Sequence, residues 1–194
     1  MTTNRQYYAH AIELWQDWNS KINVISRKDS DFIFEHHILH SLAIGHFNPF
    51  EPGETVLDAG TGGGFPGIPL AMNFPDTRFT LCDSIGKKVR VAAAVAEGLG
   101  LGNVTSVNAR IESLPESFDW VVTRAVTTLE NFYPWVRGRF RKGILCLKGG
   151  DVMAEIASFC ASCKVDPGSV SVWRINDWLE DNYFDEKFVI AVRK

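Results

Sequence analysis

The chain has 194 residues, a hydrophobic content of 45% and a formal net charge of -3. This size allows one sizeable core with some chain left for an appendage, and no uninterrupted apolar stretch is long enough to span a bilayer. The charge excludes a globally basic nucleic-acid-binding protein, so any contact with RNA must come from a local patch.

The first part of the chain predicts a helical extension. Residues 1–6 lack the apolar core of a signal peptide, which favours a cytoplasmic protein. Up to about Phe50 apolar residues recur at helical spacing, and Pro52 and Gly53 end the pattern. We expect an N-terminal helical extension over residues 1–50 and the main domain over 51–194.

Two residue pairs in the chain have spacings that metal sites use. His36 and His40 lie four residues apart in a helical region, and Cys160 and Cys163 form a CxxC pair. Neither pair has the further ligands at the spacing that a zinc site needs. We therefore expect no metal, and interpret the cysteines as part of a helix face and the histidines as packing or RNA-contacting residues.

From Thr55 onward short apolar runs alternate with helical segments, a pattern typical of a parallel sheet with crossover helices. The expected strands are residues 55–58, 78–82, 104–108, 119–123, 144–147, 170–173 and 188–192, with helices beginning near Pro66, Gly86, Thr127 and Val152. This order predicts one doubly wound α/β domain, in which ligands bind at the carboxyl ends of the strands.

The first expected strand runs directly into a glycine-rich loop. Asp58 ends the strand, and five glycines follow within the eight positions 60–67. Glycine adopts positive φ and lets another molecule approach the backbone closely. We interpret the segment as a cofactor loop, with Asp58 facing the same space.

The second expected strand ends in another acid. Asp83 lies roughly 20 residues beyond the loop, the spacing at which an acid reaches the hydroxyl groups of a ribose. Alone, Asp83 could be an ordinary N-cap of the helix that starts near Gly86. With the glycine loop before it, Asp83 predicts a nucleoside cofactor.

The details of the loop decide between two cofactor classes. Gly62, Gly64 and Gly67 match the dinucleotide fingerprint formally, but Pro66 offers no N–H where a pyrophosphate would need one. The acid-x-Gly-x-Gly run at 58–62 instead resembles the first motif of class I S-adenosylmethionine-dependent methyltransferases, where a carboxylate suits a cationic ligand. We favour S-adenosylmethionine and keep an NAD(P)-dependent oxidoreductase as a rival.

A further polar cluster, residues 108–112, follows the third expected strand. Backbone amides and a polar group there could bracket an adenine edge while Ile111 packs on its face. The alternative is a helix start with exposed charges.

Motifs spread over residues 18 to about 150 resemble the glucose-inhibited division protein B family. They are Trp18-Asn19-x-x-Ile22-Asn23, His37-Ile38-Leu39-x-Ser41-Leu42, Asp58-x-Gly60-Thr61-Gly62-Gly63-Gly64-Phe65-Pro66-Gly67-Ile68-Pro69-Leu70, Asp83-Ser84-x-Gly86-Lys87-Lys88, Arg110-Ile111-Glu112, Thr123-Arg124-Ala125 and Leu147-Lys148-Gly149. The resemblance implies a Rossmann-like enzyme with a seven-stranded, mostly parallel sheet. It also implies methyl transfer from S-adenosylmethionine to N7 of a guanine in 16S rRNA.

The resemblance also assigns site residues. It implies cofactor contacts at Gly60, Phe65, Ile111, Glu112 and Arg124, with Asp83 on the ribose side. From the loop we add Asp58, Gly62 and Gly64. The chain departs from the family pattern at His40, where Asp is frequent, and at Thr123, where Ser is common.

The implied chemistry agrees with the residues. Guanine N7 carries a free lone pair and loses no proton on alkylation, so the enzyme needs no general base. We expect catalysis by positioning, with Arg124 or Lys148 fixing the guanine O6 and a phosphate. A second rival is an RNA-binding or ribosome-assembly protein that keeps the fold without turnover.

Three basic clusters are candidates for contact with 16S rRNA or the 30S subunit: Lys21, Arg27 and Lys28; Lys87, Lys88 and Arg90; and Arg137, Arg139, Arg141 and Lys142. Each alone is more typical of a solvated helix end, but with the resemblance we expect at least one to contact RNA. We expect a monomer. For the aromatic residues 173–184 we predict only packing on the sheet.

Overall fold

The structure is a computed structural model that describes residues 1–124 and 126–194; Ala125, the last residue of the Thr123-Arg124-Ala125 motif, lies outside the described residues. The N-terminal region is helical, with a 3-10 helix (Arg5–Tyr8), α1 (Ala9–Lys21), a π-helix (Ile33–Leu39) and α2 (His40–Phe47). Within the described residues no helix is long and apolar enough to cross a membrane.

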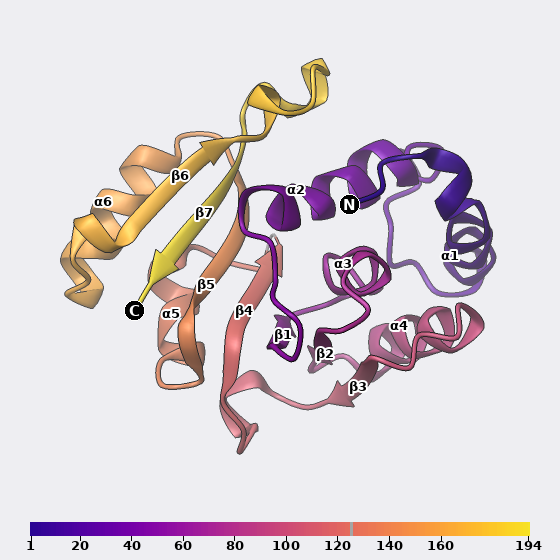
Figure 1. Ribbon diagram of the computed structural model, residues 1–194, viewed down its shortest axis with the longest axis horizontal. Coiled ribbons are helices and arrows are strands. Elements are labelled where there is room, and N and C mark those ends of the chain that lie inside the picture. The colour runs from indigo at the N-terminus through magenta and orange to yellow at the C-terminus, as the bar shows by residue number, and fades with distance from the viewer. Residues whose placement is uncertain (125) are drawn as a thin grey trace.

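Strands and helices alternate through most of the remaining chain (Figure 1). They are β1 (Thr55–Ala59), α3 (Gly67–Asn73), β2 (Arg78–Asp83), α4 (Gly86–Gly98), β3 (Val104–Asn108), β4 (Phe118–Arg124), α5 (Leu129–Val136), β5 (Phe140–Gly149), α6 (Val152–Cys163), β6 (Val170–Arg174) and β7 (Lys187–Arg193). Single-turn 3-10 helices occupy Ile111–Ser113, Pro167–Ser169, Ile175–Asp177 and Asn182–Phe184.

The strands form one seven-stranded sheet in the order β3-β2-β1-β4-β5-β7-β6. The pairs among β1 to β5 are parallel, whereas β7 pairs antiparallel with both β5 and β6. The sheet order reverses between β1 and β4, which puts the expected ligand crevice at the carboxyl ends of these strands. The predicted Rossmann-like fold is confirmed, and each expected strand lies within an observed one.

Helices cover both faces of the sheet (Figure 1). Successive strand residues point to opposite faces, so on β4 Trp120 and Val122 join the core beneath α1 to α4, while Val121 joins the core beneath α5 and α6. This alternation decides which side chains can reach a common site. Arg124 is in phase with Trp120 and Val122, and therefore belongs to the α1–α4 side.

The N-terminal region packs directly on the glycine loop. Trp15 on α1 is fully buried, its indole Nε1 donates to the carbonyl of Gly63 at 2.7 Å, and its ring stacks on Phe65 at 4.3 Å between centroids. Residues 1–50 thus share one core with the sheet. The division of the chain into 1–50 and 51–194 stays a prediction.

Two of the C-terminal aromatic residues, for which the sequence predicted packing on the sheet, stack on α2 instead. Trp173 stacks on Phe47 with centroids 5.7 Å apart, and Trp178 stacks on His46 at 4.4 Å. The segment between β6 and β7 thereby lies against α2, close to the carboxyl ends of the strands (Figure 1).

Candidate active site

The glycine loop turns back on the ends of β1 and β2. The amides of Gly60 and Thr61 both donate to the carbonyl of Cys82, at 2.8 and 3.0 Å. Gly60 and Gly62 have φ values of 77° and 57°, a region that side chains with Cβ rarely adopt. The loop therefore holds its backbone close to the β2 terminus without side chains in between.

Asp83 connects this loop to the segment after β2. Its Oδ2 accepts from the amide of Gly62 at 3.0 Å, and its Oδ1 accepts from the amide of Ile85 at 2.8 Å. Each carboxylate oxygen has a further lone pair for a ligand. Asp83 lines a cavity of about 700 Å³ at this end of the sheet, so the structure places it beside the glycine loop as the spacing predicted.

Asp58 differs from the expectation that it faces the ligand space. It is fully buried and does not line the cavity, because its Oδ2 accepts from the Thr61 hydroxyl at 2.6 Å and from the amide of Gly67 at 2.8 Å beneath the loop. Burial raises the pKa of Asp58 to about 7. Its Oδ1 has no hydrogen-bond partner within the described chain.

Of the other loop residues predicted to contact the cofactor, some line the cavity and one does not. Gly60, Gly62 and Phe65 line the cavity, whereas Gly64 does not. A Cβ on Gly64 would meet the Ile68 side chain at 2.4 Å, so this glycine permits close packing inside the loop. The prediction that Gly64 contacts the cofactor is not supported by its position.

We call one side of the cavity the β2–β3 half, because its residues follow the ends of those two strands. Ile111 and Glu112, in the 3-10 helix after β3, line it together with Asp83. Ile111 is nearly buried, and Glu112 is exposed. This half combines carboxylates with an apolar wall, which suits a nucleoside that has hydroxyl groups and a flat base.

The opposite side, the β4–β7 half, contains Arg124 at the end of β4. Its Nη2 lies 2.9 Å from Nδ1 of His37, its Nη1 donates to the carbonyl of His36 at 3.4 Å, and its guanidinium lies 5.0 Å from the ring centroid of Phe65. Burial lowers the pKa of Arg124 to about 10. Arg124 therefore stays cationic at neutral pH while it is largely shielded from solvent.

Sequence reasoning missed three residues of this half, namely His37, Tyr183 and Lys187. Tyr183 stacks on His36 at 3.6 Å between centroids, and Nζ of Lys187 lies 3.5 Å from the Tyr183 ring centroid. His40, which the sequence singled out as a departure, also lines the cavity. These residues come from both ends of the chain, so no local pattern connects them. The available signals were the motif that begins at His37 and the aromatic segment 173–184.

Lys148 differs from the expected role in base positioning, because it does not line the cavity. On β5 the buried Leu147 faces the α1–α4 side, so Lys148 points to the other face, opposite to Arg124. There Nζ forms an ion pair with Glu155 at 2.7 Å and donates to the carbonyl of Thr127. Its direct partners are thus α6 and the segment after β4.

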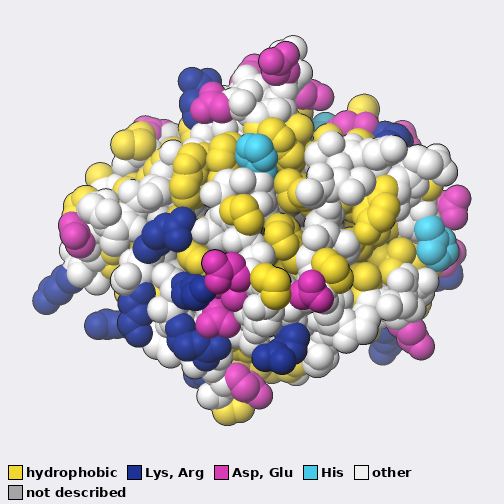
Figure 2. All heavy atoms as spheres, viewed as in Figure 1, with side chains coloured by type: hydrophobic (Ala, Val, Ile, Leu, Met, Phe, Trp, Pro, Cys, Tyr) yellow, Lys and Arg dark blue, Asp and Glu magenta, His cyan; other side chains and the backbone are white. Residues whose placement is uncertain are grey.

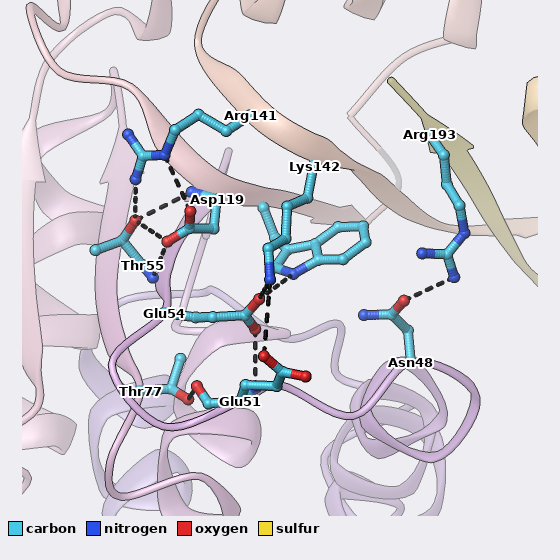
Figure 3. A network of polar contacts seen from close by, with 10 residues as sticks. Asn48, Glu51, Glu54, Thr55, Thr77, Asp119, Arg141, Lys142 and Arg193 are labelled. Carbon is cyan, nitrogen blue, oxygen red and sulfur yellow. Dashed lines mark hydrogen bonds and ion pairs between the residues drawn. The ribbon is translucent and has the colours of Figure 1, made fainter.

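Two residues of the third basic cluster, Arg141 and Lys142, lie at the other end of the sheet (Figure 3), whereas Arg139 donates to the carbonyl of Glu112. Arg141 donates from Nε to Asp119 at 3.0 Å, and Lys142 Nζ lies 2.5 Å from Oε1 of Glu54. In Figure 2, Asp and Glu side chains lie among the Lys and Arg side chains of this face. These two cations are therefore matched by carboxylates, whereas Lys88 of the second cluster lines the cavity.

In the two pairs with metal-like spacing, His36 and Cys163 have other hydrogen-bond partners, whereas Nε2 of His40 is buried without one among the described residues. His36 Nδ1 lies 2.9 Å from Oδ1 of Asp29, and Cys160 and Cys163 lie on α6. In the part of the chain that the structure describes, no three His, Cys, Asp or Glu side chains gather as metal ligands.

Comparison with known proteins gives a consistent family. Residues 4–176 match the family model described as rRNA small subunit methyltransferase G. Two relatives with the name ribosomal RNA small subunit methyltransferase G, from Christiangramia forsetii and Bacteroides fragilis, are each 46% identical to the chain. The matches cover 92% and 97% of this chain, and 84% and 92% of the relatives.

Solved structures agree on the fold. Magnesium protoporphyrin IX methyltransferase from Synechocystis with bound SAM superposes with a TM-score of 0.61 at 18% identity, covering 98% of this chain and 95% of that chain. A SAM-dependent methyltransferase from Aquifex aeolicus gives the same TM-score and identity, with 90% and 97% coverage. Because the matched family spans most of the sequence and the fold agrees with the predicted one, the chain belongs to the rRNA small subunit methyltransferase G family.

Proposed function

We propose that the protein transfers the methyl group of S-adenosylmethionine to N7 of a guanine in 16S rRNA. The observation that carries the proposal is one cavity with two unlike halves. The β2–β3 half presents carboxylates and an apolar wall, and the β4–β7 half presents Arg124 and Lys187. A nucleoside cofactor suits the first half, and an anionic RNA substrate suits the second.

The residues of the first half fit the cofactor. Asp83 would hold the ribose hydroxyls with its free lone pairs, and Ile111 and Glu112 would flank the adenine. The amino group of the ligand is a cation, and the unpartnered Oδ1 of the buried Asp58 is an acceptor that such a group would satisfy directly or through water. Bound S-adenosylmethionine supplies an electrophilic methyl group on a sulfonium centre.

The same geometry opposes a dinucleotide. A pyrophosphate needs free amides at the start of the helix after the loop. Pro66 precedes α3 and has no N–H, and the amide of Gly67 already donates to Asp58 at 2.8 Å. The first turn therefore lacks the donors that the NAD(P)-dependent oxidoreductase would require.

Catalysis would depend on position. Because N7 has a free lone pair, no side chain has to remove a proton. Arg124 would orient the guanine and its phosphate in line with the methyl group, an effect worth up to about 7–11 kcal/mol in well-oriented reactions. Lys148 would act indirectly, because its hydrogen bond to the carbonyl of Thr127 fixes the position of the neighbouring Val126, which lines the cavity.

The proposed substrate also sets the context of the protein. The enzyme would act in the cytoplasm, as a monomer, on 16S rRNA either free or in the 30S subunit. Lys88, Arg110 and Lys187 line the cavity and could contact the phosphates. A steep fall of RNA affinity with added salt is the expected signature.

The test uses 30S subunits from cells that lack the gene. Incubation with the protein and tritiated S-adenosylmethionine should label the 16S rRNA, and nucleoside mass spectrometry should identify 7-methylguanosine. Binding of NAD without methyl transfer would favour the oxidoreductase. Binding to 30S subunits with no label under any condition would favour an RNA-binding protein without turnover.

A further inference from the structure

The π-helix places His37 against Arg124 in a way that fixes the proton on the imidazole ring. Nη2 of Arg124 lies 2.9 Å from Nδ1 of His37. A guanidinium has donors only, so Nδ1 must be the acceptor of this hydrogen bond. A neutral His37 therefore carries its proton on Nε2.

That Nε2–H donor has no hydrogen-bond partner in the part of the chain that the structure describes. His37 is 9% exposed, and Nε2 is buried without a hydrogen-bond acceptor among the described residues. A buried donor left unpaired costs roughly 1–3 kcal/mol. Since His37 lines the cavity next to Phe65 and Arg124, an acceptor on a ligand is the natural partner.

The neighbours of His37 define the class of ligand. The charged side chains of the β4–β7 half, Arg124 and Lys187, are cations, and none of the described residues that line this half carries a carboxylate. Both faces of the Tyr183 ring are covered, by His36 and Lys187, so the ring is closed to a base that would stack on it. Recognition here must therefore use the edge of the base, and that edge must carry acceptors.

We infer that His37 donates from Nε2 to O6 of the methyl-accepting guanine and thereby selects guanine over adenine. The inference rests on the proposed function and assigns a further residue to the same site. Guanine presents two acceptors, N7 and O6, on this edge, whereas adenine presents a donor at position 6. N7 is the nucleophile and must stay free, so O6 is the acceptor left for His37.

A neutral donor suits this reaction better than a charged one. The base becomes cationic when N7 accepts the methyl group, and an imidazolium beside O6 would repel the product. Burial and the adjacent Arg124 lower the pKa of His37 to about 3. His37 thus stays neutral at physiological pH and adds no second positive charge beside the base to that of Arg124.

Two amide variants separate the two nitrogens of the ring. In His37→Gln the side-chain NH2 can replace the Nε2 donor, whereas in His37→Asn the carbonyl can replace the Nδ1 acceptor for Arg124 but no donor reaches the base. We expect kcat/KM for 30S methylation to fall about 10- to 100-fold in His37→Asn and to recover most of that loss in His37→Gln. The dissociation constant for S-adenosylmethionine, measured by calorimetry, should change in neither variant.

Four results would overturn the inference, three from the variants and one from NMR. His37→Asn could methylate at the wild-type rate, the two folded variants could lose activity equally, or both could lose cofactor affinity, which would assign the donor to the cofactor carboxylate. A long-range proton–nitrogen NMR spectrum of the wild-type protein tests the tautomer without any substitution, and an Nδ1–H form would also overturn it. Failure of the wild-type protein to methylate 30S subunits would instead refute the proposed function.

Discussion

The two ends of the parallel strands use the same kinds of polar residues but differ in how these are partnered. At the amino end, both oxygens of Glu54 and both of Asp119 accept hydrogen bonds, from Trp120, Lys142, Arg141 and backbone or side-chain atoms of neighbouring residues (Figure 3). At the carboxyl end, His37, His40 and Asp58 each have a buried polar atom without a partner within the described chain.

This difference in hydrogen bonding distinguishes polar residues that stabilise the fold, at the amino end, from polar residues that are available to a ligand, at the carboxyl end. A buried polar group is normally hydrogen-bonded, so a buried polar group without a partner beside a cavity indicates a position where a ligand atom binds. Among the described residues, the amino end has one such atom, Nδ2 of Asn48, whose Oδ1 accepts from Arg193 at 2.9 Å. A further one, Oε2 of Glu35, belongs to a carboxylate whose Oε1 pairs with Arg5 at 2.6 Å. The described residues of the carboxyl end have three of them: Nε2 of His37 and Nε2 of His40, both from residues that line the cavity, and Oδ1 of Asp58, which lies beneath the glycine loop. Charge density alone would have favoured Arg141 and Lys142 as the RNA-binding residues. Their ion pairs with Asp119 and Glu54 indicate instead that they stabilise the amino ends of the strands.

The largest effect should come from Arg124. Arg124→Ala removes the cation that orients the substrate, and we expect kcat/KM for 30S methylation to fall about 100-fold or more. Because Arg124 lies on the β4–β7 half, the dissociation constant for S-adenosylmethionine should stay within about 3-fold of wild type. Calorimetry and tritium transfer measure the two quantities. An unchanged rate would show that the base is held without Arg124.

At the amino end, the matching experiment should change stability and leave the reaction alone. Glu54→Ala leaves the buried Trp120 indole N–H without its acceptor and Lys142 without its closest partner. We expect a loss of about 2 kcal/mol in the free energy of unfolding, measured with urea, and an unchanged kcat/KM for the folded protein. Glu51→Ala is the control, because Glu51 is exposed and its carboxylate lies 3.9 Å from Lys142.

A smaller effect should appear in the pH dependence of stability. The pKa of Asp58 is raised from 3.8 to about 7, so its contribution is fully present below pH 3.8 and is lost as the pH rises towards 7. His37 and His40 act in the opposite sense: burial lowers both pKa values, so their contribution is present above pH 6.5 and is lost as the pH falls.

Asp58→Asn isolates the first of these terms. An amide can keep the contacts with Gly67 and Thr61 but does not titrate. The free energy of unfolding of Asp58→Asn minus that of wild type should grow by up to about 1.4 kcal/mol per unit between pH 4 and 7. Urea unfolding at several pH values measures it. A constant difference would mean that Asp58 is already ionised in the folded protein.

The fold followed from local patterns, and half of the site followed with it. Asp83 and the glycine loop are adjacent because parallel strands end at one edge of a sheet, so a spacing in sequence becomes a distance in space. The face of the sheet to which a strand residue points was harder to predict. Arg124 is the last residue of β4 and Lys148 the last but one of the neighbouring β5, yet the two side chains face opposite sides of the sheet.

The remaining part of the site depends on long-range packing. His37 and Tyr183 are 146 positions apart, and their contact through His36 requires the C-terminal segment to lie on the π-helix. Nothing in either local pattern predicts that contact. The buried position of Asp58 could not be predicted from the sequence either, because it depends on a hydrogen bond from the amide of Gly67, where the chain turns back beneath the loop.

The smallest effect should come from Arg141, the exposed counterpart of Arg124 at the amino end. Arg141 donates to Asp119, Ser117 and Thr55, but solvent screens such a pair and the strands beneath it keep their own hydrogen bonds. Arg141→Met should shift the melting temperature by no more than about 2 °C and leave methyl transfer and RNA affinity at wild-type levels. Melting curves and filter binding at low and high salt measure these. A loss of RNA affinity in Arg141→Met that vanishes at high salt would place RNA at the amino end as well, and the contrast between the two ends would then fail.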